Sequence, residues 1–283
     1  MRFFILLVIM GLLVGGVYAA ASPHPPPLFA HSPQSQLFYA DGFETETNWQ
    51  KFEEIVGGSS CYGDGGIGTV VRSTAVAAAG QYSLRVWANQ ALSPKSNHLI
   101  GYKEISETGQ TGVVTYHLQG YIASETYLEG QTGPEFSLQN TRYRPPVGYL
   151  TSIAGIQNIV NPYFETGDWR VCHNGAWVTF ATITPTLAAA TWYTFTLEAD
   201  FSHNVYRFLT IEGNGDAWYF DLSAYHIAEE NRGWQEESFV VTVENENLWN
   251  NCGTAGVFDY KLYYDEIAVW LQEERVFLPL LVR

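Results

Sequence analysis

Methionine and basic residues are scarce in this chain of 283 residues. Only two methionines occur, Met1 and Met10, and 14 lysines and arginines stand against 29 aspartates and glutamates. A surface with a formal net charge of −15 repels phosphate backbones, so we expect no nucleic-acid partner. The same charge disfavours strongly anionic polysaccharides, and it favours neutral glycans and divalent cations as ligands.

Long hydrophobic runs are absent once the N-terminus is passed. Residues 1–21 combine one arginine, an apolar run from Phe3 to Val17 and a small-residue exit, which is typical of a cleavable signal peptide. The run is shorter than the ~20 residues that a membrane span needs, although an uncleaved anchor is the alternative. We therefore expect a protein that is secreted or held at the cell surface, with no membrane span after cleavage.

The two ends of the chain differ in composition from its body. Residues 22–35 are rich in proline and predict an extended linker. Residues 36–272 show no repeat and no internal boundary, which predicts one domain and, we expect, a monomer. Residues 273–283 resemble the short C-terminal tails of some secreted bacterial proteins, or form a last edge strand that Pro279 interrupts.

Cysteine is limited to Cys61, Cys172 and Cys252. An exported chain can keep disulfides, but an odd number allows at most one intrachain bridge. The spacings match no metal-binding motif. Of the possible pairs we expect Cys172–Cys252, because both positions fall in later predicted loops.

No segment shows a sustained helical period, whereas alternation of period two recurs along the chain. It is clear in residues 113–122, 135–139, 192–201 and 261–271, and Gly213–Asp216 predicts a hairpin turn. About twelve strands result, and with 15% aromatic residues they predict an all-β, antiparallel jelly-roll sandwich. In the last run, the residues expected on one side are Tyr263, Ile267 and Val269.

Three short blocks occur in an order known from one fold superfamily. They are Asp41-Gly42-Phe43-Glu44 with Trp49, then Ala79–Val86, and Tyr263–Val269 near the end of the domain. This layout resembles bacterial carbohydrate-binding modules and laminin-G-like domains with the concanavalin A-like jelly roll. The resemblance implies the fold, and because this fold carries many activities it does not select one of them.

The same resemblance implies a structural calcium ion. In many such modules the opening glutamate and the closing aspartate meet at the cation, whose preferred ligands are oxygens. Carried over by position, the ligands are Glu44 and Asp265, with a carbonyl near Gln81 and Asp41 as a possible third carboxylate. The alternative is that these carboxylates are solvated strand ends.

Two polar rows are candidates for contact with sugar. Amide, hydroxyl and imidazole groups bind sugar hydroxyls, and aromatic rings stack on sugar faces. If the two strands adjoin, the rows form one glycan-binding surface; otherwise they are solvated outer faces. The rows are Thr115, His117, Gln119 and Tyr121, and Glu135, Ser137 and Gln139. The tryptophans nearest loops, and so best placed to stack on sugars, are Trp169, Trp234 and Trp249.

Catalysis is the alternative to binding. A glycoside hydrolase needs a close pair of carboxyls, for which the sequence offers Glu135 and the acids of Glu244-Asn245-Glu246. A polysaccharide lyase needs a base and groups that stabilise a carboxylate. Its candidates are His117, Tyr121, Gln139 and Arg142.

Three hypotheses therefore stand, and each predicts a different surface. A non-catalytic lectin-like domain predicts exposed aromatics beside a concave sheet and no close carboxylate pair. An enzyme predicts that its candidates converge in one groove. A structural or adhesive protein predicts a blocked sheet face. We adopt glycan binding as the leading hypothesis.

Overall fold

A computed structural model describes residues 35–46, 48–55, 67–89, 97–123, 133–161, 166–247 and 259–272. Within these ranges every regular element is a β-strand, and no helix long and apolar enough to cross a membrane occurs. The predicted signal peptide, the C-terminal tail and nearly all of the predicted linker lie outside the described residues. So do Cys61, Trp249 and Cys252.

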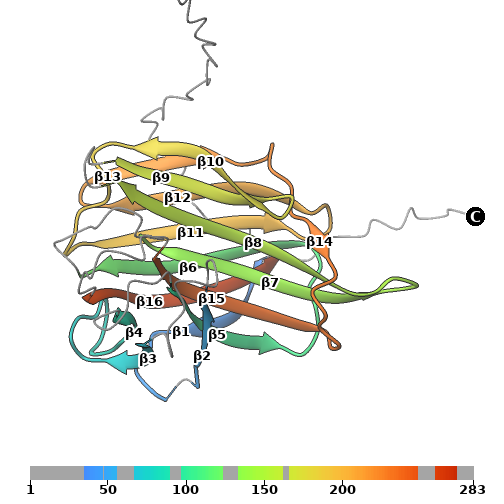
Figure 1. Ribbon diagram of the computed structural model, residues 1–283, viewed down its shortest axis with the longest axis horizontal. Helices are drawn as coiled ribbons and strands as arrows, with labels where there is room; N and C mark the ends of the chain where they lie inside the picture. The colour runs from blue at the N-terminus through green and yellow to red at the C-terminus, as the bar shows by residue number, and fades with distance from the viewer. Residues whose placement is uncertain are drawn as a thin grey trace, which may run out of the picture.

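Eight strands form the first sheet, which is antiparallel throughout (Figure 1). Its central strand β6 lies between β11 and β16, and the first strand β1 pairs with the last strand β16. The order is β13 (Asp216–Asp221), β12 (Val205–Gly213), β11 (Trp192–Asp200), β6 (Val113–Ile122), β16 (Asp259–Gln272), β4 (Ser83–Asn89) and β3 (Ile67–Ser73), with β1 (Ser35–Asp41) on β16.

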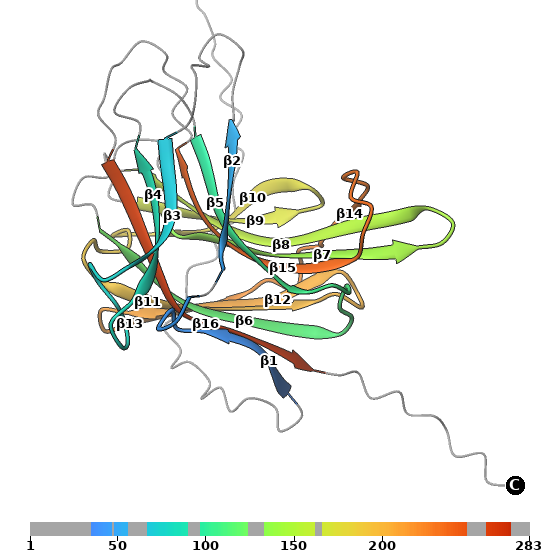
Figure 2. The ribbon, with the colours of Figure 1, turned by 90° about the horizontal axis from the view of Figure 1, so that it is seen from below.

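The second sheet also has eight antiparallel strands and packs over the first (Figure 2). Figure 2 shows that β2 and β5 rise out of the layer of β7 and β8, so that the sheet curves. The order is β10 (Ala176–Ile183), β9 (Thr166–His173), β8 (Gly148–Asn161), β7 (Glu135–Arg144), β15 (Ser238–Asn247), β5 (Asn97–Ser106) and β2 (Gln50–Ile55), with β14 (Glu229–Glu230) on β8.

The core lies between the two sheets and is built by alternation. Along β11, Tyr193, Phe195 and Leu197 are buried in the core while the intervening residues face outward. Phe136 and Leu138 fill the core from β7 of the other sheet. The two antiparallel sheets confirm the jelly-roll β-sandwich predicted from the sequence, and this is the concanavalin A-like architecture that the three blocks resemble.

The strand reading was right in most places and wrong in two. The described residues contain sixteen strands where about twelve were expected, because short edge strands such as β14 have little alternation. In β16 a bulge between Asp265 and Ala268 shifts the alternation. Tyr263 consequently contacts Tyr121 outside the core, on the face opposite Ile267, and not beside it as predicted.

The predicted hairpin at residues 213–216 is confirmed. Strands β12 and β13 meet through Asn214 and Gly215, whose φ angles of 55° and 83° are both positive. Two positive φ angles define a type I′ turn, whose twist matches that of the flanking strands.

The predicted bridge between Cys172 and Cys252 is wrong, because Cys172 is a buried free thiol. It lies in strand β9 and not in a loop. Burial raises the pKa of its thiol, so the group is a weak nucleophile that packs as a small apolar side chain.

Three tyrosines of the first sheet reach across the core to the backbone of the second. Tyr116 donates to the carbonyl of Thr242 at 3.0 Å, and Tyr206 donates to that of Cys172 at 2.9 Å. Tyr264 donates to the carbonyl of Glu244 at 2.7 Å and accepts from the N–H of Glu135 at 3.2 Å. Burial raises the pKa of all three hydroxyls well above its usual range, so they stay protonated donors. These bonds fix β7, β9 and β15 against the first sheet.

Candidate functional site

The outer face of the curved second sheet carries a groove of about 400 Å³. Side chains from β2, β5, β15, β7 and β8 form its floor, and the segment before β15 adds a wall. We call this feature the groove. Its lining residues are Gln50, Phe52, Ile100, Tyr102, Glu104, Gln139, Thr141, Ile153, Arg232, Trp234, Glu236, Glu237, Ser238, Val240 and Thr242.

Strand register explains why these residues share one face. Phe136 and Leu138 point into the core, so Ser137 and Gln139 between them point outward. Ser137 pairs with Thr242 on β15 and with Gly155 on β8. A Cβ atom built on Gly155 would lie 3.5 Å from the Cβ of Ser137, which places both on this outer face.

Exposed aromatic rings mark the groove. Trp234 is 57% exposed and Phe52 is 53% exposed, although both are large and apolar. They belong to segments far apart in the sequence, and both line the groove. Tyr102 lies between them in the chain and donates its hydroxyl proton to Gln50 Oε1 at 2.6 Å. Rings held this way offer flat apolar faces edged by polar groups.

A second, more open cavity of about 610 Å³ continues from the groove. It shares Glu104, Glu236 and Glu237 with the groove and is also lined by Tyr143 and Tyr149. The two tyrosine rings are 5.1 Å apart between centroids. The surface is therefore extended, aromatic and acidic.

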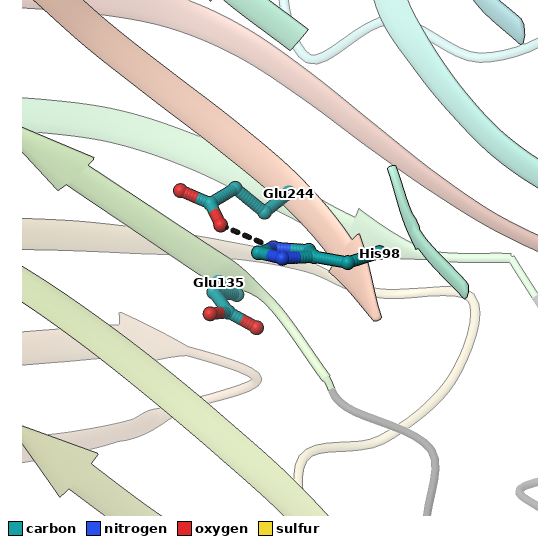
Figure 3. Close-up of side chains that lie close together, drawn as sticks. All are labelled: His98, Glu135 and Glu244. Atoms are coloured by element: carbon teal, nitrogen blue, oxygen red, sulfur yellow. Dashed lines mark hydrogen bonds and ion pairs between the residues drawn. The ribbon is translucent and has the colours of Figure 1, made fainter. Parts of the chain in front are cut away.

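Beside the groove, three ionisable side chains from three neighbouring strands converge (Figure 3). They are His98 on β5, Glu244 on β15 and Glu135 on β7, and we call them the histidine–glutamate cluster. One ligand atom of each lies within 4.8 Å of the others. Glu244 and Glu135 face each other in the β15–β7 register. Both are nearly fully buried, at 5% and 1% exposure.

Each carboxylate of the cluster has its own hydrogen-bond donors. His98 Nε2 lies 2.5 Å from Glu244 Oε2, and Thr242 Oγ1 and Ser137 Oγ donate to Glu244 Oε1. Gln157 Nε2 contacts both oxygens of Glu135, at 3.3 and 3.2 Å. Burial opposes ionisation of Glu244, but His98 and the two hydroxyls hold the pKa of this carboxyl below its usual range.

The two predicted glycan-binding rows do not form one surface. Thr115, His117 and Gln119 lie on β6, between β11 and β16 of the first sheet. Glu135, Ser137 and Gln139 lie on β7, between β15 and β8 of the second sheet. The condition for a single surface, that the two strands adjoin, is not met, because the chain changes sheets between β6 and β7.

Of these residues, the structure brings only part of the second row to the groove. Gln139 lines it, while Ser137 and Glu135 continue the same outward row toward the cluster. The first row is elsewhere: His117 contacts Thr196 and the ring of Trp270, and Tyr121 packs on Trp192.

The predicted lyase residues do not converge. His117 and Tyr121 belong to the first sheet, whereas Gln139 and Arg142 belong to the second. Arg142 is buried, donates to the carbonyl of Phe201 at 3.0 Å and pairs with Glu229 at 2.8 Å. Its role is structural, because strand alternation turns it away from the face that carries Gln139.

Of the hydrolase candidates, Glu135 meets Glu244, its cross-strand neighbour. The side chain of Glu246 lies outside the described residues, so the expected pairing of Glu135 with Glu246 stays a prediction. The leading hypothesis predicted no close carboxylate pair, and this prediction was wrong.

The predicted calcium ligands lie near one loop, where their oxygens accept N–H groups. Glu44 Oε1 accepts from Gln81 and Tyr82, at 2.8 and 3.0 Å. Asp265 Oδ2 accepts from Ala78 and Ala79, at 2.8 and 3.2 Å. Burial raises the pKa of Asp265. The calcium site stays a prediction.

Asp41, the possible third carboxylate, fits a cation least well. Its Oδ2 accepts from Tyr39 and Trp49, at 2.9 and 3.0 Å, and its Oδ1 accepts from the N–H of Phe43. Both oxygens therefore serve to hold the loop after β1.

Sequence reasoning found some site residues and missed others. Trp234 was expected to be available for stacking and is exposed in the groove. The same prediction was wrong for Trp169, which is fully buried in the core. His98 and Phe52 were not singled out as site residues. No local signal marks His98, because its partner Glu244 is 146 positions away.

Comparison with known proteins gives likeness of fold without a family. No family model matches the chain, and no curated protein matches it. Among solved structures, an endo-β-1,4-glucuronan lyase from the fungus Trichoderma reesei is 16% identical, with 71% of this chain and 86% of that chain covered at a TM-score of 0.47.

Two other solved structures are similar at the same level. A carbohydrate esterase from the Shiga toxin-encoding bacteriophage phi24B is 12% identical, covering 80% of this chain and 90% of its own at a TM-score of 0.46. The alginate lyase Aly36B is 14% identical, covering 68% and 81% at a TM-score of 0.38. These likenesses concern the sandwich, and no activity passes from them to this chain.

Proposed function

We propose that this protein binds a neutral polysaccharide in the groove, without cleaving it, as a secreted lectin-like domain. The observation that carries the proposal is the exposure of Trp234 and Phe52 in one groove. Large apolar rings exposed together on a concave surface mark a binding site, because leaving them in water costs free energy. Sugars match such rings, since their apolar faces stack on aromatics while their hydroxyls bind polar neighbours.

Polar groups in the groove supply the second half of sugar recognition. Gln50 and Gln139 offer amides that both donate and accept, and Arg232 offers donors. The groove encloses about 400 Å³ and its continuation about 610 Å³, which is enough space to favour a chain of sugars over a single sugar.

Charge selects the class of polysaccharide. Glu104, Glu236 and Glu237 line both cavities, and Glu107 lines the second, against Arg232 in the groove. A surface with this excess of carboxylates repels uronate and sulfate polymers. Neutral glycans carry no such penalty.

Burial argues against catalysis by Glu135 and Glu244. A catalytic carboxyl must touch the glycosidic oxygen or the anomeric carbon. Both carboxyls are nearly fully buried, and within the described residues neither lines the groove. The third hypothesis, a scaffold with a blocked face, does not account for the groove.

A screen against immobilised polysaccharides tests the proposal. We expect binding to one or more neutral glucans, mannans, xylans or galactans and no binding to alginate or heparin. Release of reducing ends would instead show a hydrolase, and new products absorbing in the ultraviolet would show a lyase. If the protein binds none of the neutral polymers, the proposal is refuted.

A further inference from the structure

Beyond glycan binding, the histidine–glutamate cluster has the composition of a metal site. Among the described residues it is the single group of three or more histidines, cysteines or carboxylates close enough to hold one ion. His98 contributes an imidazole nitrogen, and Glu135 and Glu244 contribute carboxylate oxygens (Figure 3). The three side chains come from adjacent strands β5, β15 and β7, so the sheet itself sets their spacing.

Charge balance supplies the first argument for an ion. Glu135 and Glu244 are opposed across neighbouring strands and are removed from water. Two buried carboxylates repel each other in a medium of low dielectric, and each is costly unless it is compensated. A divalent cation placed between the two carboxylates offsets both negative charges and removes their mutual repulsion.

The surrounding hydrogen bonds supply the second argument. Ser137 and Thr242 hold Glu244 Oε1, which leaves Oε2 directed at His98. Gln157 holds Glu135 from the far side, on β8. Metal ligands are commonly oriented by such outer hydrogen-bonding groups, which fix the position of the side chain.

We propose that His98, Glu135 and Glu244 bind one divalent transition-metal ion, with Zn²⁺ as the best match. One imidazole and two carboxylates suit Zn²⁺, whereas Ca²⁺ and Mg²⁺ prefer oxygen ligands alone. Three protein ligands leave one tetrahedral position for water or another donor. This site is separate from the predicted calcium ligands Glu44 and Asp265, and it does not depend on glycan binding.

Binding requires a small local rearrangement. Ligand atoms in a tetrahedral zinc site lie about 3.3 Å apart, since each bond is about 2.0–2.1 Å. His98 Nε2 and Glu244 Oε2 are 2.5 Å apart, so the ion replaces their hydrogen bond and separates the two atoms. The proton of that hydrogen bond is released to solvent when the metal binds.

The test uses the full-length protein after treatment with a chelator. We expect isothermal titration to show one equivalent of Zn²⁺ bound, and Co²⁺ to give the visible absorption of a tetrahedral site with nitrogen and oxygen ligands. His98→Gln and Glu244→Gln should each weaken Zn²⁺ affinity by at least about tenfold. Glu104→Gln removes a charge from the same face of β5 outside the cluster, and its affinity should equal that of the unchanged protein.

Several outcomes would overturn the proposal. They are the absence of a stoichiometric Zn²⁺ site, a cobalt spectrum of octahedral type, or equal loss of affinity in Glu104→Gln. The cobalt spectrum is measured on the unchanged protein, so this test stays valid even if a variant misfolds. Glycan binding is measured on the same metal-free samples, so its failure and the failure of the metal site are read separately.

Discussion

The hydroxyl group of Tyr264, on the last strand of the first sheet, donates a hydrogen bond of 2.7 Å to the backbone carbonyl of Glu244 on the second sheet. The same hydroxyl accepts from the N–H of Glu135 at 3.2 Å. One buried oxygen thus joins the backbones of the two residues whose carboxylates meet on the outer face. The core in this way positions the histidine–glutamate cluster from behind.

Removing that hydroxyl should destabilise the sandwich. In Tyr264→Phe a buried carbonyl and a buried N–H lose a partner, which costs about 1–3 kcal/mol. Urea unfolding measures the change in free energy. Tyr263→Phe is the matched control, because its ring lies on the other face of β16 against Tyr121, away from the backbones of Glu135 and Glu244, and we expect a smaller loss. Equal losses in both variants would show that the cross-sheet bond has no special weight.

The groove aromatics should govern affinity and not stability. Trp234→Ala or Phe52→Ala should weaken binding to the best neutral polysaccharide about tenfold, or about 1.4 kcal/mol, because each removes a stacking face. Calorimetric titration gives the affinity, and the melting temperature should stay nearly unchanged since both rings are exposed.

Tyr219 is the control for this pair. It is an exposed aromatic, at 40%, on β13 of the first sheet and outside the groove. Tyr219→Ala should leave affinity unaltered. An equal loss of affinity in this variant would show that the glycan does not bind in the groove of the second sheet alone.

Acid should weaken the protein through Glu229. Burial opposes ionisation of this carboxylate, but Arg144 and Arg142 hold its pKa below the ordinary 4.5. A lowered folded-state pKa contributes stability above the unfolded value, and that contribution is lost as pH falls through the folded value. The melting temperature should therefore drop as pH is lowered below about 4.5, the ordinary value.

The variant Glu229→Gln isolates this contribution. At pH 7 it should have a lower melting temperature than the unchanged protein, since Arg142 loses its ion pair. The difference between the two melting temperatures should become smaller in acid. Glu212→Gln on β12 controls for the loss of one charge. If the difference in melting temperature is the same at neutral and at acid pH, Glu229 is not the group that makes the protein less stable in acid.

The calcium expectation has a thermal test. If the ion joins Glu44 to Asp265, adding Ca²⁺ to chelator-treated protein should raise the melting temperature, by about 2–4 °C for each kcal/mol of binding free energy. Glu44→Gln should lose this rise, and Glu244→Gln should keep it. A melting temperature that does not respond to Ca²⁺ would remove the calcium site.

Local pattern predicted the strands better than their partners. Alternation assigns the faces of β6, β7 and β11 correctly, because side-chain direction depends only on neighbours in the chain. It cannot say that β6 and β7, consecutive in sequence, belong to different sheets, since pairing is set by contacts between distant segments. For that reason the sequence left open whether the two polar rows form one surface.

The site was the harder part for the same reason. The cluster combines His98, Glu135 and Glu244 from three separate strands, and no spacing in the sequence announces it. The bulge at Asp265–Ala268 also has no signal in the sequence, and because of it Tyr263 lies on the face opposite Ile267. The exposure of Trp234 could be predicted, because the residue lies near a loop and outside the alternating strands.

The pairing of β1 with β16 brings Ser35 beside Gln272, at the edge of the first sheet (Figure 2). The groove opens on the outer side of the other sheet. A tether, a fusion partner or a solid support joined at Ser35 or at Gln272 is therefore attached at the edge of the first sheet, away from the groove. Immobilised in this way, the protein presents its aromatic face to the bulk liquid, where a long polymer can reach it.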